Sequence, residues 1–156
     1  MKALSLGPVV ALVLTLSACS SLAPEDDPLD PLTRGLIGLS AIDGFAGVEL
    51  DGDAVTLLTR GERPGARAAA QASLGADVAL DVRVVPEQGR GSESLKNRVA
   101  GAVSDFLWVD YNEVTGYVDL GVTTADAVRR AQVELGVLPQ DREWITVQVS
   151  YPVRPL

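Results

Sequence analysis

The residue types that could carry out acid–base or nucleophilic chemistry are few in this chain. Its 156 residues include no histidine and a single cysteine, Cys19. The absence of histidine excludes Ser-His-Asp and Cys-His catalysis, the usual zinc sites and the commonest general base near neutral pH. Paired carboxylates are therefore the groups left for hydrolytic chemistry.

The acidic side chains fall mostly at turns or at outward-facing strand positions. Asp51 and Asp53 flank Gly52 in a predicted hairpin, and Asp119 alternates with apolar neighbours. Two carboxylates on a tight hairpin supply too few ligands for a metal ion. We interpret these acids, together with Glu49, Asp110 and Glu113, as a solvated sheet face and turn residues. We therefore predict no catalytic residue, no metal site and no cofactor.

One glycine-rich segment stands where a phosphate-binding loop would lie. Gly89, Arg90 and Gly91 follow a predicted strand and precede a predicted helix. The segment lacks the Lys and Ser or Thr pair of a P-loop and the glycine spacing of a dinucleotide site. We predict that it is a flexible link.

The amino-terminal segment places a cysteine directly after an apolar run. Lys2 precedes the run from Leu4 to Leu16, which is shorter than the roughly 20 residues that span a bilayer and matches the core of a signal peptide. The sequence Leu16-Ser17-Ala18-Cys19 resembles the lipobox of bacterial lipoproteins. This resemblance implies cleavage between Ala18 and Cys19, a diacylglycerol on the Cys19 sulfur and acylation of the new amino terminus.

The lipobox resemblance also implies a location. Two or three acyl chains are enough for stable membrane anchoring. Ser20 follows the cysteine, and a residue other than Asp there resembles the outer-membrane address of bacteria with two membranes. In a bacterium with one membrane, the anchor would lie in the outer face of the cell membrane. An ordinary secretory signal is the alternative.

The charge of the mature chain argues against two classes of binding partner. Removing residues 1–18, which include Lys2, leaves 138 residues with 12 Lys and Arg against 21 Asp and Glu, a formal charge of −9. Such a surface is unsuited to nucleic acid and to anionic lipid bound by charge alone. Residues 19–31 are rich in proline and acids, so we predict a flexible tether that carries the lipid.

The remaining residues predict an α+β fold of two similar units in one small domain, linked by residues 87–93. The first unit, residues 32–86, begins with a helix from Leu32 to Leu39. A hairpin, a helix stopped by Gly75 and a third strand follow, as turn residues and alternating apolar residues indicate. The predicted bounds are Phe45 to Leu50 and Ala54 to Thr59 for the hairpin and Pro64 to Leu74 for the helix, and the third strand alternates from Val78 to Val84 and ends at Pro86.

The second unit, residues 94–156, repeats this order, so each unit is written (α)ββαβ. Thr123 is predicted to cap its second helix, with Asp126 in the first turn. The predicted elements are a helix through Leu95 and Val99, strands from Phe106 to Tyr111 and from Gly116 to Val122, a helix ending at Leu135, and a strand from Trp144 to Tyr151. The two second helices share five letters at one constant offset: Ala66, Ala70, Gln71, Leu74 and Gly75 match Ala127, Ala131, Gln132, Leu135 and Gly136.

Two families resemble the folded part. The order of elements with Val48, Leu50, Gly52, Val55 and Leu57 resembles the BON domain of bacterial envelope proteins, which implies tandem copies and, in some members, phospholipid binding. The segment Trp108-Val109-Asp110-Tyr111-Asn112 is similar to the duplicated pro-region of secreted serine proteases, which implies a chaperone or inhibitor role.

These patterns together predict a lipid-anchored envelope protein that acts as a non-enzymatic binding or envelope-maintenance module. The expected partners are the membrane, through Cys19, and an envelope protein or lipid headgroup, with no nucleic acid. One alternative is a protease-inhibitor-like or chaperone-like module that binds through an exposed strand or through residues 151–156. The other is a carboxylate-based hydrolase, which would need two facing acids in a cleft and a raised pKa.

Overall fold

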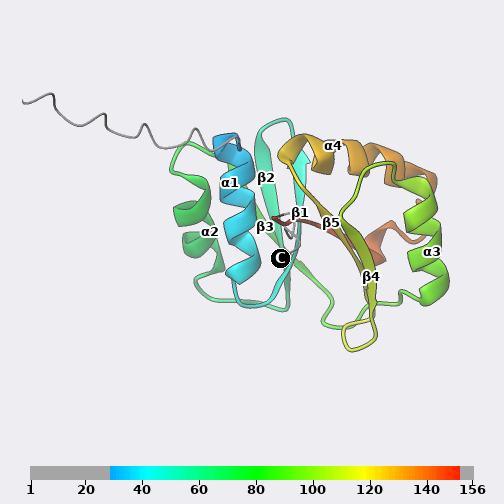
Figure 1. Cartoon of the computed structure of the whole chain (residues 1–156). Coiled ribbons are helices and arrows are strands. Elements are labelled where there is room, and N and C mark those ends of the chain that lie inside the picture. The colour runs from blue at the N-terminus through cyan, green and yellow to red at the C-terminus, as the bar shows by residue number, and fades with distance from the viewer. Residues whose placement is uncertain (1–28, 152–156) are drawn as a thin grey trace, which may run out of the picture.

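The computed structural model describes residues 29–151, which form helices and two three-stranded sheets (Figure 1). The α+β class predicted from the sequence is confirmed. The elements in chain order are α1 (Pro31–Gly38), η1 (Leu39–Ala41), β1 (Phe45–Asp51), β2 (Ala54–Arg60), α2 (Ala66–Leu74), β3 (Leu80–Val85), α3 (Glu93–Ala102), β4 (Trp108–Asn112), β5 (Tyr117–Val122), α4 (Ala125–Glu134), η2 (Leu135–Val137), η3 (Arg142–Trp144) and β6 (Ile145–Val149).

The two sheets have the same strand order and pairing. In the first, β1 and β2 form an antiparallel hairpin and β3 joins β2 in parallel after the crossover helix α2. In the second, β4 and β5 form the hairpin and β6 joins β5 in parallel after α4. Gly52 turns the first hairpin with φ +60°, a conformation that glycine adopts without steric cost.

Surroundings of the helices differ between the two halves. Helix α1 packs along α2, whereas α3 packs against β4 and η2. The common strand order is therefore a likeness of topology, and the relation of the two units as repeats stays a prediction.

A single core joins the two sheets. Apolar side chains that alternate along the strands, such as Val48, Leu50, Val118 and Leu120, are buried in one cluster with residues of the helices. At the seam between the sheets, a Cβ atom on Gly47 of β1 would lie 2.9 Å from the carbonyl oxygen of Val147 in β6. The close approach of these two strands therefore requires a residue without a side chain.

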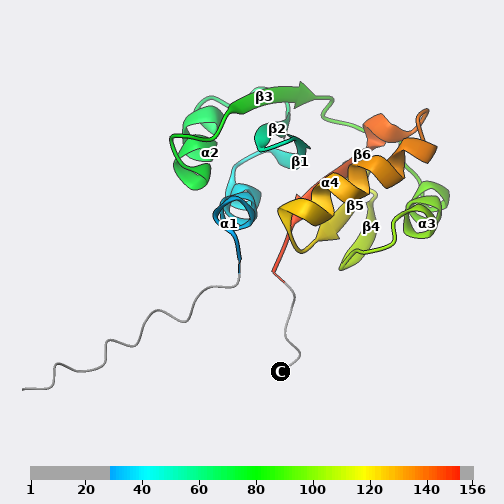
Figure 2. The ribbon, with the colours of Figure 1, turned by 90° about the horizontal axis from the view of Figure 1, so that it is seen from above.

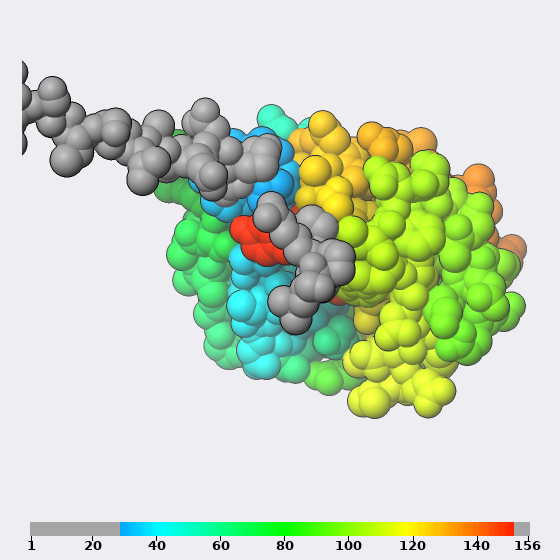
Figure 3. Space-filling view, in the orientation of Figure 1, coloured from blue at the N-terminus to red at the C-terminus, as the bar shows by residue number. Residues whose placement is uncertain are grey.

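Helices from both halves lie over this seam. Helix α4 packs on β1 as well as on β6, and α1 contacts β6 and α4. Figure 2 shows α4 next to β1, and the space-filling view shows the surfaces of α1 and α4 side by side (Figure 3). Each half therefore contributes a helix to the other.

Several predicted element ends need correction. Helix α1 begins at Pro31 with Asp30 as its N-cap, so this end of the predicted tether belongs to the fold. Helix α4 is capped by Thr124, whose hydroxyl accepts from the Ala127 backbone N–H, and not by Thr123. Helix α2 begins at Ala66 instead of Pro64, because Gly65 holds φ +84°.

The strands of the second half are shorter than predicted. Phe106 and Leu107 precede β4 and are partly exposed, so the first strand of this hairpin begins at Trp108. Trp144 belongs to η3, and β6 ends at Val149. Glu93, predicted to lie in the link, is the first residue of α3, because Ser92 caps that helix.

The segment between the two halves is held against the second hairpin, and the prediction of a flexible link is wrong. The backbone N–H groups of Gly89 and Gly91 donate to the carbonyls of Thr115 and Gly116, each at 2.7 Å. A Cβ atom on Gly89 would collide with the Gly116 backbone. These glycines therefore serve close backbone packing, and their N–H groups are already used.

Candidate functional site

A cavity of about 640 Å³ opens where the described chain enters the fold. It lies between the start of α1, the β1–β2 turn, the segment before β3 and the start of α4. Its lining combines apolar and acidic side chains with one arginine: Asp30, Pro31, Leu32, Asp53, Ala54, Leu74, Asp77, Val78, Ala79, Ala125, Asp126 and Arg129.

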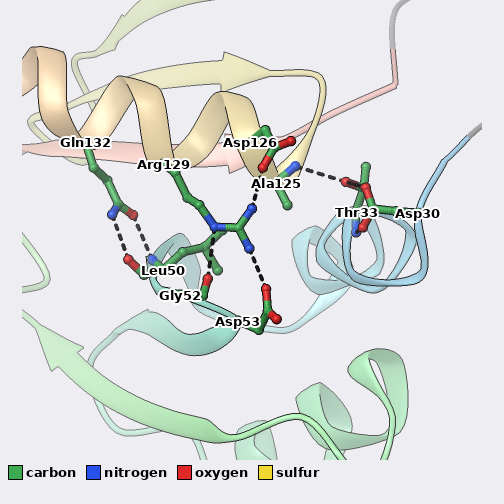
Figure 4. A network of polar contacts seen from close by, with 9 residues as sticks. All are labelled: Asp30, Thr33, Leu50, Gly52, Asp53, Ala125, Asp126, Arg129 and Gln132. Atoms are coloured by element: carbon green, nitrogen blue, oxygen red, sulfur yellow. Dashed lines mark hydrogen bonds and ion pairs between the residues drawn. The ribbon is translucent and has the colours of Figure 1, made fainter.

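The start of α1 is joined to the start of α4 by one buried hydroxyl. Thr33 is completely buried, and its Oγ1 donates to Oδ2 of Asp30 at 2.6 Å (Figure 4). Oγ1 of Thr33 also accepts from the backbone N–H of Ala125 at 2.9 Å. The Thr33 side chain and the backbone N–H of Thr33 lower the pKa of Asp30 by hydrogen bonding to its carboxylate.

Arg129 of α4 holds the tip of the first hairpin. Its Nε donates to the carbonyl of Gly52 at 2.9 Å, and its two terminal nitrogens bind Asp53 at 2.8 Å and Asp126 at 2.6 Å (Figure 4). All three guanidinium nitrogens are therefore engaged within the protein. The acids around the cavity outnumber this single cation, so the opening disfavours anions.

Gln132, one turn further along α4, pairs with the backbone of β1 (Figure 4). Its side-chain oxygen accepts from the N–H of Leu50 at 2.7 Å, and its amide nitrogen donates to the Leu50 carbonyl at 2.8 Å. The Gln132 amide thus takes the place of a neighbouring strand at Leu50, and it satisfies the backbone N–H and C=O of that residue. Its sequence match, Gln71 of α2, instead donates to the carbonyls of Gly75 and Val78 in its own half.

The environment of Asp119 differs from the one predicted from the sequence. Asp119 was expected on a solvated sheet face, but it is partly buried, and burial raises its pKa. Its Oδ1 accepts from the hydroxyl of Thr146 at 2.5 Å, and the exposed Asp110 stands directly opposite on β4. Asp119 and Asp110 are thus a facing carboxylate pair, with one member in water.

Glu49 also departs from the expected solvated role. Its Oε1 lies 2.6 Å from Arg83 and 3.9 Å from Arg142, so it bridges β3 to η3, the turn before β6. Burial lowers the pKa of Arg142. Glu113 stands in the second hairpin turn, as predicted. Asp51 ends β1 at an exposed position.

The predicted lipidation and cleavage residues, Cys19 and Ala18, lie outside the described residues, as do positions 152–156 of the predicted binding tail. Between residues 29 and 151, no three His, Cys, Asp or Glu side chains are grouped so as to hold a metal ion. No helix in that range is both long and apolar enough to cross a bilayer.

The hydrogen bonds that hold α1 and α4 beside the cavity could not be predicted from the sequence, because they join distant segments of the chain. Thr33 is 92 positions from Ala125, and Gln132 is 82 positions from Leu50. The repeated Gln71 and Gln132 letters were the one available signal. The match shows that the two glutamines occupy equivalent helix positions, but it does not show that Gln132 binds β1.

Comparison with known proteins gives no family for this chain. No protein family matches the sequence, and no curated protein matches it.

Proposed function

We propose that this chain is an exported lipoprotein, anchored through Cys19, whose folded part is a non-enzymatic binding module of the cell envelope. The observation that carries the proposal is the sequence Leu16-Ser17-Ala18-Cys19 directly after an apolar run of signal-peptide length, with no other cysteine in the chain. A lone thiol in an exported protein would otherwise be a reactive liability.

The fold is compatible with attachment at the amino-terminal side. Asp30 caps α1, so 11 residues separate Cys19 from the first helix. Figure 2 shows the start of α1 and the end of β6 on one side of the molecule, opposite β3. An anchor at Cys19 would leave the β3 side free for a partner.

The polar side chains of α1 and α4 have a structural role. The Arg129 nitrogens, the Gln132 amide and the Thr33 hydroxyl are all bonded within the protein and hold α1 and α4 in place. We therefore assign none of these three side chains to a catalytic site.

Intact mass of the membrane-extracted protein tests the anchor. We expect wild type to be cleaved before Cys19 and to carry diacylglycerol plus one acyl chain. Cys19→Ser should lose the lipid mass, whereas the matched control Ser21→Ala should keep it. An unlipidated wild-type mass with cleavage elsewhere would refute the proposal and bring the protease-inhibitor-like alternative forward.

A carboxylate-based hydrolase is the second candidate, because Asp119 has a raised pKa and faces Asp110 across the β4–β5 hairpin. Glycosidase substrates tested on the full chain would show hydrolysis abolished by Asp119→Asn and by Asp110→Asn, but unchanged by Asp105→Asn. A loss common to all three variants, or no hydrolysis by wild type, would exclude this candidate.

A further inference from the structure

We propose that two copies of this chain associate through the free edge of β3, in antiparallel register centred on Val82, and form one continuous sheet of six strands. The proposal is independent of the lipid anchor. It rests on the direction of the β3 backbone groups and on the order of charges along that strand.

The edge of β3 is open in the described part of the chain. Strand β3 pairs only with β2, and Figure 2 shows it at the outside of the molecule with no described segment beyond it. The Ala79 carbonyl accepts from the N–H of Val55 in β2, and the Val85 carbonyl accepts from the N–H of Gly61, directly after β2. Because backbone direction alternates along a strand, the N–H and C=O groups of Leu80, Val82 and Val84 point to the free edge.

The charges on β3 are placed so that two antiparallel copies of the strand bring opposite charges together. Asp81 and Arg83 lie on one face, on either side of Val82, and their side chains are 74% and 54% exposed. In an antiparallel pair centred on Val82, Asp81 of each copy stands opposite Arg83 of the other. Opposite charges at facing positions stabilise a strand pair.

The alternating direction of the N–H and C=O groups along β3 favours the same register. With Val82 opposite its own copy, Leu80 stands opposite Val84, and these three positions are the ones with outward-facing backbone groups. They become hydrogen-bonded pairs, and the Asp81–Arg83 pairs fall at the non-hydrogen-bonded positions, where facing side chains are closest. Val84, which is 51% exposed, would be covered by Leu80 of the other copy.

Existing contacts at the edge are compatible with this arrangement. Arg67 of α2 donates to the Leu80 carbonyl at 2.9 Å and lies 3.4 Å from Asp81. A carbonyl oxygen accepts two hydrogen bonds, and a carboxylate accepts more, so both groups keep capacity for a second partner. Arg83 likewise contacts Glu49 through one terminal nitrogen.

The other outer strand lacks this complementarity. Strand β4 has the sequence Trp108-Val109-Asp110-Tyr111-Asn112, in which the only charge is one carboxylate. Any antiparallel pairing of β4 with its own copy leaves Asp110 opposite itself or opposite an uncharged residue. We therefore assign self-association to β3.

Disulfide trapping tests the register directly. The full chain with Cys19→Ser, solubilised in detergent, is prepared with a single new thiol as Val82→Cys or Val84→Cys. At the centre, the two Val82 Cα atoms would be about 5.5 Å apart, within the range of a disulfide. The two Val84 positions would be offset by roughly 13 Å along the strand. We expect a cross-linked dimer for Val82→Cys and none for Val84→Cys, although Val84 is the more exposed residue.

Charge exchange gives an independent readout by sedimentation equilibrium. Asp81→Arg creates two Arg–Arg pairs across the proposed interface and should weaken dimerisation at least about tenfold. Asp81→Arg combined with Arg83→Asp restores opposite charges at both pairs and should restore dimerisation. Circular dichroism checks that each variant is folded. A wild-type chain that stays monomeric, equal cross-linking of the two cysteine variants, or a double variant as weak as the single one would overturn the proposal.

Discussion

Thr33 shows how one buried hydroxyl can join two distant helices. It is fully buried, donates to Asp30 and accepts from the Ala125 N–H. Thr33→Val keeps the shape but leaves that buried N–H without a partner, which should lower the free energy of unfolding by about 1–3 kcal/mol. Urea denaturation measures the change. Thr33→Ser keeps the hydroxyl and should cost clearly less, so equal losses would contradict the role given to the hydroxyl.

Asp119 predicts a specific pH dependence of stability. Burial raises its pKa in the folded state above the ordinary value of 3.8. Between 3.8 and the raised folded pKa, the native state binds more protons than the unfolded state, so stability falls as pH rises through that window. Asp119→Asn, which can still accept from Thr146, should therefore raise the free energy of unfolding at neutral pH and leave it unchanged well below pH 3.8.

Asp30 is a control for this experiment, because its pKa is shifted in the opposite direction and its effect on the pH dependence of stability has the opposite sign. Hydrogen bonds from Thr33 lower its pKa in the folded state, so its contribution is present above pH 3.8 and is lost as pH falls through the folded pKa. Asp30→Asn should reduce stability at neutral pH. Denaturant unfolding at several pH values measures both variants, and a shift of the same sign for the two would refute the assignments.

At the scale of elements, Gln132 fixes α4 on the edge of β1. Gln132→Leu removes both hydrogen bonds to Leu50 and should cost about 1–3 kcal/mol, because a backbone N–H and a carbonyl lose their partners. Gln71→Leu is the matched control. Gln71 donates only to carbonyls beside its own helix, partly in exposed positions, so its replacement should cost less. Thermal unfolding of the two variants compares them, and equal losses would argue against the cross-half contact.

Local sequence was sufficient to identify most elements but not all of their ends. The hairpin at Gly52, the helix end at Gly75 and the inward-facing Ile145, Val147 and Val149 were all predicted, and the structure has the turn, the helix end and the three buried side chains; Thr146 is buried as well. Thr123 and Thr124 are chemically equivalent caps, and the choice of Thr124 depends on which turn of α4 packs into the core. Propensity alone does not contain that information.

At the scale of the molecule, the seam between β1 and β6 depends on Gly47. Its Cβ would lie 2.9 Å from the Val147 carbonyl oxygen and 3.0 Å from Cβ of Thr146. Gly47→Ala should push the two strands apart and cost about 1–3 kcal/mol. Gly101→Ala, inside α3 with open space around its Cβ, should instead stabilise by roughly 0.5–1 kcal/mol. Calorimetry of the two variants measures this contrast, and a harmless Gly47→Ala would refute the tight seam.

Sequence alone determined the α+β class, the order of the main elements and the groups available for chemistry. Residue type and spacing carry this information locally, through turn residues such as Gly52 and through apolar alternation along each strand. Tertiary structure alone decided that α4 packs on β1, that Gly89 and Gly91 dock on the second hairpin, and that Asp119 is desolvated. These contacts join segments tens of residues apart, where the pairing depends on how two amphipathic layers meet, and no local pattern encodes it.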